Sequence, residues 1–478
     1  MNIATLRFTP ANQRAFARFS GDFNPVHRDP VAARRIAAGE PIVHGMHLLL
    51  RALDAHFTRA RAAAPAGISA RFERPALIGD AVTVERRGRT SLALTLDGAL
   101  RLVDVAIDTG AASPGDTAAT WNIPRRRERS TRVPRVRTLS DVPGASGVIG
   151  LPTAQAVRRA FPHAARALGA DAVAAFAAIS RLVGMECPGR GSLLSAISLH
   201  VTANERARHL AWRVSRTDAR FGLVRIEISS GGVRGTVDAF LGPQPVPAPS
   251  FEAVAASVAA DEFAGQRAVI VGGSRGLGAT TALLVAAGGG VPLVTFVAGG
   301  ADAAALRRDA ARFGRRIHLT QFDVVEDPLA RLVRACARFR PTHLYYFATP
   351  RIFGRRRDPF DDAVFQRFAQ FYVSGFAGVC AAVRSLVPSL NVFYPSTTAI
   401  DLEPMRELTE YAAAKAAGEV LCHSLNRAMP GLRILVSRLP RVTTDQTATI
   451  LPVPARDPVA TLLPIVRELQ RPSTGTDQ

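Results

Sequence analysis

Residues 262–478 alternate short apolar segments with helix-like segments, and this alternation constrains the fold more than any other feature. RAVIVGG (267–273) has the composition of a buried strand, and ATTALLVAAGG (279–289) that of a helix. Further strand-like segments follow: VPLVTFV, RIHLTQFD, THLYYFA, NVFYPS and RILVSRLP. Strands that alternate with helices form a parallel sheet covered by helices. We therefore predict an α/β domain with a doubly wound parallel sheet.

A glycine-rich turn, GGSRGLG, follows the first of these strands. A turn between a strand and a helix points backbone N–H groups and the helix N-terminus at a pyrophosphate, and glycine lets the phosphates approach. We therefore expect the loop to bind a dinucleotide. Its candidate contacts are Gly272, Ser274, Arg275, Gly276, Leu277 and Gly278.

The surroundings of this loop favour NADPH over NADH. Arg275 is a cation within the loop, and TFVAGG (295–300) offers no carboxylate for a ribose 2′-hydroxyl. This combination suits a 2′-phosphate. Arg275 can equally be one of the many arginines of this chain. Asp323, in QFDVVED, can contact the adenine or cap a helix.

YAAAK (411–415) contains the only lysine of a chain that has 60 lysine and arginine residues. Tyr411 and Lys415 are four residues apart, so a helix would place them on one face. Reduction of a ketone needs a hydride and a proton. A tyrosine hydroxyl can donate the proton when a nearby ammonium lowers its pKa from about 10.

The glycine loop, a strand-end serine and YxxxK, in this order, resemble the short-chain dehydrogenase/reductase family over nearly all of 262–450. The resemblance implies a Rossmann-type fold and NADPH-dependent reduction of a 3-oxoacyl thioester. It implies that Tyr411 donates the proton, that Lys415 also binds the ribose, and that Ser396 binds the substrate carbonyl. Thr397 and Thr398 follow Ser396, which leaves the identity of that hydroxyl open.

Two positions depart from the family pattern. FYVSGF has Tyr372 where the family often has an asparagine, so we expect the proton relay to be altered or to run through water. FATP, with Ala348, replaces the common N-A-G. Ala348 and Asp323 complete the expected cofactor contacts. An inactive nucleotide-binding homologue is the alternative.

The N-terminal stretch GDFNPVHRDP places Asp22 and His27 in an irregular segment, because Pro25 disfavours helix for Asn24. An aspartate and a histidine can together hold a water and exchange its protons, which serves to add or remove water across a double bond. A helix beginning near Gly45 would direct N–H groups at a thioester carbonyl. Taken alone, the two residues could be a turn residue and a surface imidazole.

The complete string D-x-N-P-x-H followed by P-I-x-H-G-M resembles the MaoC-like, (R)-specific enoyl-thioester hydratases of the hot-dog fold. RFERPALIGDAVTVE matches the return strand of that family, and the resemblance covers about 10–105. It implies that Asp22 and His27 are the catalytic pair and that Gly45 contributes to the oxyanion site.

Two proline-containing polar stretches divide the chain. We predict a hot-dog dehydratase domain over 1–111, an Arg/Pro-rich linker over 112–145, and a second, degenerate hot-dog-like domain over 146–241. A Pro-rich linker over 242–261 and the reductase domain over 262–478 follow. The second part lacks D-x-N-P-x-H, and we expect it to complete a double hot-dog and shape the acyl tunnel. An unrelated α+β module is the alternative.

Together the two chemistries predict a bifunctional enzyme of fatty-acid or polyketide-like biosynthesis. Its reductase would turn a 3-oxoacyl thioester into a 3-hydroxyacyl thioester, which its dehydratase would turn into a trans-2-enoyl thioester. The acyl group would be carried by coenzyme A or an acyl carrier protein. Alternatively only one half is active, or the chain binds acyl groups or a carrier without turnover. Arg125, Arg126, Arg127 and Arg129 could then serve an acidic carrier, or simply be a solvated linker.

The composition limits the classes of partner and of site that we expect for this chain. The net charge is +21, but the arginines are dispersed and accompany no nucleic-acid-binding motif, so we expect anionic small molecules or an acidic carrier rather than nucleic acid. The four cysteines form no C-x-x-C pair, which argues against zinc and a disulfide framework. No apolar run reaches about 20 residues, and no signal pattern opens the chain. We expect a cytoplasmic protein without metal or membrane, and by resemblance a homo-oligomer.

Overall fold

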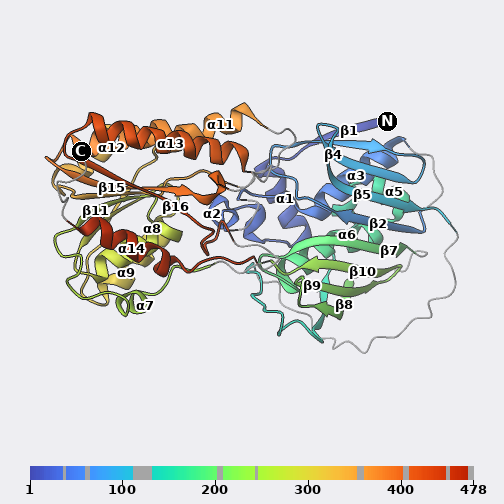
Figure 1. The fold of residues 1–478 in the computed structure, drawn as a ribbon. Helices are drawn as coiled ribbons and strands as arrows, with labels where there is room; N and C mark the ends of the chain where they lie inside the picture. Colours follow the sequence, from blue (N-terminus) through green and yellow to red (C-terminus); the bar gives the residue numbers. More distant parts are fainter. Residues whose placement is uncertain are drawn as a thin grey trace. The chain divides into compact units, whose positions relative to one another are not determined.

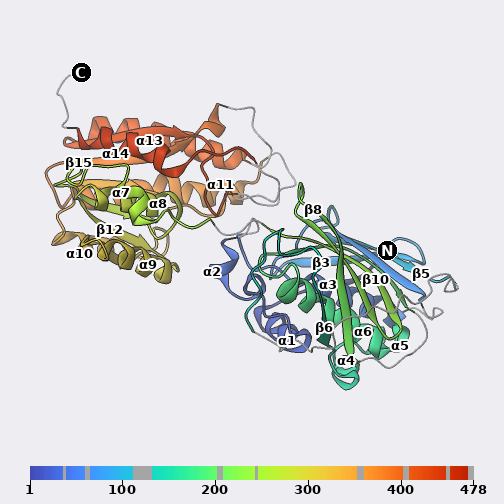
Figure 2. The same cartoon turned by 90° about the horizontal axis from the view of Figure 1, so that it is seen from below.

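The computed structural model describes residues 1–35, 39–59, 65–110, 132–201, 208–242, 246–352, 360–401, 408–447 and 453–471. The chain forms two compact units. The first comprises Met1–Gln244 with Thr449–Pro452, and the second comprises Pro245–Ala448 with Val453–Gln478. Figures 1 and 2 show the elements of both.

The first unit contains a ten-stranded sheet and a set of helices. In chain order its elements are β1 (Asn2–Arg7), α1 (Pro10–Ser20), η1 (Pro25–His27), α2 (Pro30–Ala33), α3 (Gly45–Arg59), β2 (Gly67–Phe72), β3 (Ala81–Arg86), β4 (Ser91–Leu96), β5 (Leu100–Asp108), β6 (Ser146–Gly150), α4 (Ala154–Ala160), α5 (Pro162–Leu168), α6 (Ala170–Arg181), η2 (Leu182–Glu186), β7 (Leu193–Val201), β8 (His209–Asp218), β9 (Leu223–Ser230) and β10 (Val233–Phe240).

The order of its strands reveals two copies of one topology. The sheet runs β1-β3-β4-β5-β2-β7-β10-β9-β8-β6, and its neighbouring strands pair antiparallel. Read from its own edge, the second half is β6-β8-β9-β10-β7, which repeats the first half strand for strand. β2 and β7 join the halves, with Ser69 opposite Ser198. The predicted double hot-dog is therefore confirmed, and the predicted domains over 1–111 and 146–241 share one sheet.

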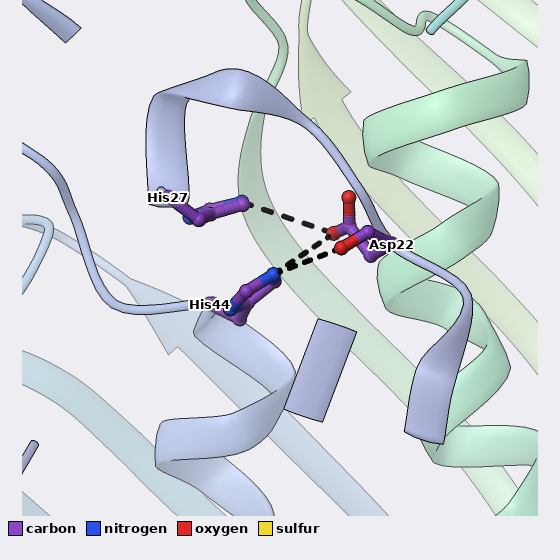
Figure 3. Close-up of side chains that lie close together, drawn as sticks. All are labelled: Asp22, His27 and His44. Atoms are coloured by element: carbon purple, nitrogen blue, oxygen red, sulfur yellow. Dashed lines mark hydrogen bonds and ion pairs between the residues drawn. The ribbon is translucent and has the colours of Figure 1, made fainter. Parts of the chain in front are cut away.

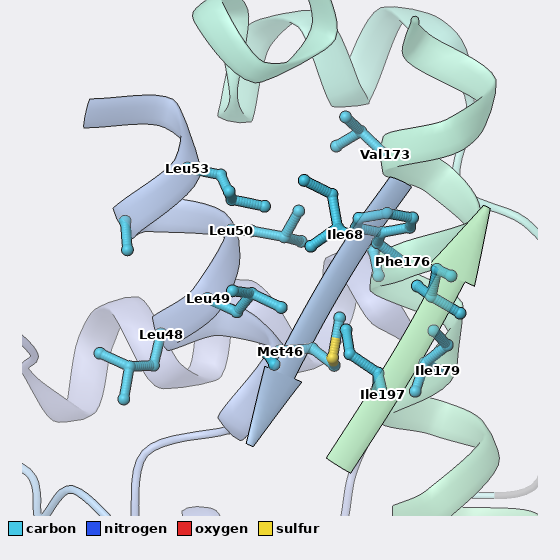
Figure 4. Packing of buried hydrophobic residues seen from close by; sticks show 14 of the residues in the cluster. Met46, Leu48, Leu49, Leu50, Leu53, Ile68, Val173, Phe176, Ile179 and Ile197 are labelled. Atoms are coloured by element: carbon cyan, nitrogen blue, oxygen red, sulfur yellow. The ribbon is translucent and has the colours of Figure 1, made fainter. Parts of the chain in front are cut away.

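A long helix from each repeat packs in the interior of this unit. On α3, Met46, Leu49, Leu50 and Leu53 follow the i, i+3, i+4, i+7 pattern of an apolar face, and all four are fully buried. Figure 4 shows these side chains directed at residues of α6, β2 and β7. Because α6 is buried along nearly all of its length, it is apolar on almost every face.

The second unit alternates strands and helices. In chain order its elements are α7 (Phe251–Ala255), β11 (Arg267–Val271), α8 (Gly276–Ala287), β12 (Val291–Phe296), α9 (Gly300–Ala311), β13 (His318–Gln321), α10 (Leu329–Ala337), β14 (His343–Tyr346), α11 (Asp362–Ala369), η3 (Gln370–Gly375), α12 (Phe376–Arg384), β15 (Leu390–Thr397), η4 (Thr398–Ile400), α13 (Thr409–Ala428), β16 (Leu432–Leu439) and α14 (Pro458–Gln470).

The sheet of this unit is parallel throughout, in the order β13-β12-β11-β14-β15-β16. One apolar cluster joins it to α8, α9 and α14, and a second joins it to α10, α12 and α13, so helices cover both faces. This is the predicted doubly wound, Rossmann-type sheet. The strand order reverses at β11, between β12 and β14, which is where ligands bind in such sheets.

The predicted linkers are only partly described. Residues 111–131, with the arginine cluster at 125–129, lie outside the described residues, as do 243–245. Within the predicted 242–261 connector, residues 251–255 form α7, whose Phe251 and Val254 are buried in the second unit.

No single helix in the described part of the chain is long and apolar enough to cross a membrane. The pair Pro162–Leu168 and Ala170–Glu186, bent by 115°, has that length and composition only when its members are joined.

Candidate active sites

Hydrogen bonds within the loop after α1 bring Asp22 and His27 together. α1 ends at Ser20 and is capped by Gly21, whose φ of 81° is left-handed and therefore suits glycine. Asn24 accepts a hydrogen bond from the Val26 N–H at 3.3 Å, and the following 3-10 turn, η1, ends at His27. This turn brings the His27 ring back toward Asp22.

Three side chains form a buried cluster at this loop (Figure 3). Asp22 Oδ2 lies 3.8 Å from His27 Nε2 and 3.9 Å from His44 Nε2. The exposed fractions are 1% for Asp22, 8% for His27 and 0% for His44. His27 is therefore the member nearest to solvent. His44 completes a cluster of which the sequence identified two members as catalytic candidates.

Hydrogen bonds on the far side of each ring determine which imidazole nitrogen carries hydrogen. His27 Nδ1 faces the Ile42 carbonyl at 2.9 Å, so Nδ1 donates. Gln13 Oε1 accepts from the His44 backbone N–H at 3.2 Å and also meets His44 Nδ1 at 2.6 Å, so that Nδ1 donates as well. In the neutral ring, His27 Nε2 therefore carries a lone pair that faces the Asp22 carboxyl. His44 Nε2 lies 3.3 Å from the Asp22 backbone carbonyl oxygen and 3.9 Å from Asp22 Oδ2.

Burial controls the ionisation of the cluster. It raises the pKa of Asp22, while His27 and a hydrogen bond from Ser180 oppose the rise. It lowers the pKa of His27 and lowers that of His44 further. Both trends favour neutral groups over a buried ion pair.

The same cluster offers three metal-ligand atoms within 4.8 Å of one another. The His27 and His44 rings, however, stack with centroids 3.8 Å apart and planes 26° apart. The expectation from the sequence that no metal binds stays a prediction.

Gly45 begins α3 immediately after His44. A Cβ at Gly45 would lie 3.3 Å from Phe72 of β2 and 3.3 Å from Leu194 of β7. The start of α3 is therefore closely packed by both repeats. The expected oxyanion role of Gly45 stays a prediction.

In the second unit, the glycine loop connects β11 to α8 as predicted. Gly272 and Gly276 have left-handed φ values of 77° and 56°. A Cβ at Gly278 would lie 2.5 Å from the Gly272 carbonyl oxygen, and one at Gly272 would lie 2.9 Å from the Ala348 nitrogen. The loop thus lies against Ala348 at the end of β14. This cradle, at the N-terminus of α8, fits the phosphates of a dinucleotide.

The other candidate residues of the glycine loop, and Asp323, each contact a different part of the second unit. Arg275 Nη1 lies 3.8 Å from Asp445 Oδ2. Ser274 lies against Gly299, where a Cβ would be 2.6 Å from its Oγ. Leu277 packs on the apolar cluster that includes α8. Asp323 Oδ1 accepts the Val325 N–H at 2.9 Å, which is the turn-capping use of this residue. The adenine contact of Asp323 stays a prediction.

The three reductase candidates lie on β15 and α13, but Ser396 is engaged elsewhere. Ser396, near the end of β15, donates a hydrogen bond to Glu419. Thr397 is the hydroxyl close enough to Tyr411 to lower the pKa of its phenol. Burial raises the pKa of Tyr411 to about 12, against a lowering effect of the Thr397 bond. This direction differs from the lowering expected from the sequence.

Lys415 is buried and its ammonium is surrounded by aromatic rings. Its Nζ donates to the Pro395 carbonyl at 2.6 Å and lies 3.9 Å and 4.8 Å from the ring centroids of Tyr372 and Tyr394. Burial lowers the pKa of Lys415 to about 7. Tyr372, the residue at the family asparagine position, also meets Thr349 Oγ1 through its hydroxyl at 2.5 Å. A cation–π contact thus stands where the family often has an amide.

Comparison with known proteins identifies the first of these two regions. Residues 2–89 match the model of the MaoC like domain. Residues 2–89 form a MaoC-like domain. Over 81 residues the chain is 42% identical to an "(R)-specific enoyl-CoA hydratase" of Aeromonas caviae, covering 16% of this chain and 60% of that protein. It is 37% identical over 78 residues to "3-hydroxyacyl-thioester dehydratase X" of Mycobacterium tuberculosis (strain ATCC 25618 / H37Rv), covering 16% and 26%. The chain thus spans less than two thirds of either relative.

A short chain dehydrogenase from Burkholderia cenocepacia J2315, solved in complex with NADP, is a structural neighbour. Its TM-score is 0.38 at 21% identity, and the match covers 43% of this chain and 91% of that chain. The Rossmann-type assignment of the second unit rests on its own strand order and glycine loop.

The cluster of the MaoC-like domain is completed from outside residues 2–89. Ser180, on α6 of the second repeat, donates a hydrogen bond to Asp22 Oδ2 at 2.7 Å. Gly184, one turn later, lies so close that a Cβ there would be 2.5 Å from Asp22 Oδ1. Asn24 Nδ2 donates to the Gly184 carbonyl at 2.9 Å. The sequence offered no signal for these contacts, because the second repeat lacks the catalytic motif.

Proposed function

We propose that this chain is a bifunctional acyl-thioester enzyme. The MaoC-like domain would dehydrate a 3-hydroxyacyl thioester, or hydrate the trans-2-enoyl thioester, and the second unit would reduce a 3-oxoacyl thioester with NADPH. The observation that carries the proposal is the buried Asp22–His27–His44 cluster, in which the two Nε2 atoms lie 3.8 Å and 3.9 Å from Asp22 Oδ2. The names of both curated relatives support the substrate class.

For dehydration, the opposite pKa shifts favour a division of labour between two residues. His27 is the acceptor of the C2 proton, because burial keeps it neutral with a free Nε2 lone pair. Asp22 is the donor to the departing 3-hydroxyl, because burial raises its pKa. The C2–H and C3–O bonds break, the C2=C3 bond forms and water leaves. Return of the proton from His27 to Asp22 across the 3.8 Å gap resets the pair, and hydration is the reverse.

The backbone at the start of α3 would stabilise the negative charge that develops on the thioester carbonyl. N–H groups at a helix N-terminus are positioned donors for such an oxygen. Gly45 provides the first residue of this turn. The absence of a Cβ at Gly45 keeps the approach open between Phe72 and Leu194.

In the second unit, the Gly272–Gly278 loop and Lys415 would hold NADPH, with Arg275 near its 2′-phosphate. Bound NADPH supplies the hydride for the carbonyl. Tyr411 donates the proton to the carbonyl oxygen, and Thr397, whose hydroxyl acts on Tyr411, would bind that oxygen in place of Ser396. Ser396, engaged by Glu419, would instead stabilise α13 against β15. Coenzyme A and an acyl carrier protein remain the two proposed carriers of the acyl group.

Incubation of the full chain with NADPH and a 3-oxoacyl thioester tests the proposal. We expect Asp22→Asn and His27→Ala to accumulate the 3-hydroxy compound, and Tyr411→Phe to leave the 3-oxo compound unchanged. Lys415→Arg keeps the charge but replaces a compact ammonium by a planar guanidinium, so we expect it to abolish most reduction while dehydration continues. Variants that all behave like the parent protein would disprove the assignment.

A second candidate function is dehydration alone, with an inactive reductase fold. The Ser396–Glu419 bond and Tyr372 above Lys415 favour it, because both depart from the family arrangement. Consumption of NADPH by the parent protein, abolished in Tyr411→Phe, would exclude this candidate.

A further inference from the structure

We propose that Ser180 is a positioning residue of the acid–base cluster, supplied by the second repeat to a cluster that otherwise comes from the first. Its Oγ donates to Asp22 Oδ2 at 2.7 Å. That oxygen is also the one that lies 3.8 Å and 3.9 Å from His27 and His44. The second repeat, which lacks the catalytic motif, would thereby take part in catalysis. This inference rests on the proposed dehydratase function and refines it.

The contacts of Ser180 fix the carboxyl group on both sides. The Asn24 N–H donates to Asp22 Oδ1 at 3.0 Å while Ser180 donates to Oδ2, so the plane of the carboxyl group is determined by two donors. Gly184 lies four residues after Ser180, in the η2 turn that continues α6. Its missing side chain makes room for the carboxyl group, where a Cβ would lie 2.5 Å and 2.7 Å from the two oxygens.

The charged groups around Asp22 show what Ser180 adds. His27 and His44 face the carboxyl group directly, and Arg28 acts on it from the end of η1. From the second repeat, Arg181 is paired with Glu186 at 2.8 Å. Ser180 contributes a neutral donor beside these groups. A donor to a carboxylate favours its ionised form, so loss of the hydroxyl should increase the proton affinity of Asp22 without changing the net charge.

The test compares Ser180→Ala, Ser180→Thr and Ser192→Ala in the full chain. Ser192 is a matched control, because it is buried close by in the sequence and its Oγ donates to the Val183 carbonyl at 2.6 Å instead of to Asp22. Hydration of a trans-2-enoyl thioester is followed as a function of pH. We expect kcat/KM of Ser180→Ala to fall about tenfold, the effect of one charge-assisted hydrogen bond. In the plot of kcat/KM against pH, the limb that reports the ionisation of Asp22 should move to higher pH.

Ser180→Thr, which keeps the hydroxyl, should restore the parent profile, and Ser192→Ala should match the parent protein. An unshifted profile in Ser180→Ala, or an equal shift in Ser192→Ala, would overturn the proposal. Infrared titration of the Asp22 carboxyl group, identified by its loss in Asp22→Asn, provides a readout that needs no turnover. A higher titration midpoint in Ser180→Ala without hydration by the parent protein would refute the dehydratase and retain the positioning role. An unchanged midpoint would refute the positioning role itself.

Discussion

At the scale of single residues, the two sites depend on side chains whose surroundings oppose their charge. Asp22, His27 and Lys415 are all buried. Burial raises the pKa of Asp22 and lowers those of His27 and Lys415, and each shift favours the neutral form of the group. Groups of this kind cost stability unless other contacts compensate, and they cluster where chemistry requires them. Their partners are specific: Ser180 for the carboxyl group, and the rings of Tyr372 and Tyr394 for the ammonium.

Gly184 provides a residue-scale test that adds only one methyl group. We expect Gly184→Ala to displace the Asp22 carboxyl group, because the new Cβ would lie 2.5 Å from Oδ1. Hydratase and dehydratase activity should fall at least tenfold, since a small misplacement of a catalytic group costs about that much or more. NADPH-dependent reduction by the same preparation is the internal control. Full hydratase activity in Gly184→Ala would show that this close approach is unimportant.

The burial of Lys415 predicts that the stability of the folded chain depends on pH. Its pKa in the folded chain, about 7, lies below its ordinary value of 10.5. Between these values the unfolded chain binds more protons, so stability rises with pH, by about 1.4 kcal/mol per unit. Lys415→Met should therefore be more stable than the parent protein at pH 7, and this advantage should shrink toward pH 10.

Calorimetric unfolding across this pH range measures the difference. Arg427→Met, an exposed position on the same helix, is the control and should show no such dependence. A Lys415→Met protein that is less stable than the parent at pH 7 would contradict the buried-ammonium account.

At the scale of elements, α6 is the structural centre of the first unit and also carries Ser180. Ten of its twelve residues are buried, which explains why this segment is almost uniformly apolar. It packs against α3, and Figure 4 shows its side chains together with residues of α3, β2 and β7. The position of Ser180 therefore depends on the packing of the whole helix.

A substitution of Phe176 tests how much the packing of α6 contributes to the stability of the first unit. It is fully buried on α6, so Phe176→Ala should lower the free energy of unfolding of the first unit by about 3–5 kcal/mol. Val420→Ala, on α13 of the second unit and 66% exposed, should have little effect. Thermal unfolding followed by circular dichroism compares the two variants. Equal changes in both would mean that α6 is not a core element.

Elements that depend on local patterns could be predicted from the sequence. The strands and helices of the second unit follow from alternating composition, and the glycine loop from its place between β11 and α8. The motif around Asp22 was also readable, because its residues are neighbours in the chain. The Ser180 contact was not, since 158 residues separate it from Asp22 and nothing in its neighbourhood marks it.

The sequence also did not show which hydroxyl at the end of β15 lies near Tyr411. Ser396, Thr397 and Thr398 are adjacent, and the register of β15 decides which of them faces Tyr411. Arg438 donates to both carboxylate oxygens of Glu419, at 2.9 Å and 2.6 Å. Glu419 in turn accepts the hydrogen bond of the Ser396 hydroxyl. Thr397 is left for Tyr411. Such a choice depends on residues of α13 and β16 and cannot be read from the strand alone.

At the scale of the whole molecule, the chain forms two compact units, and the two chemistries proposed for them are consecutive on one acyl chain. The first unit is a double hot-dog with one acid–base cluster, and the second has a Rossmann-type sheet with a dinucleotide cradle. The product expected of the second unit is the substrate expected of the first. This match between product and substrate would let one acyl chain pass through both reactions.

The most direct test of that claim is mass spectrometry of the acyl thioesters formed from a 3-oxoacyl thioester and NADPH by the full chain. The account predicts a trans-2-enoyl thioester, with the 3-hydroxyacyl thioester as an intermediate that accumulates in Asp22→Asn. A 3-oxoacyl thioester that stays unchanged, together with no hydration of an added trans-2-enoyl thioester, would contradict it.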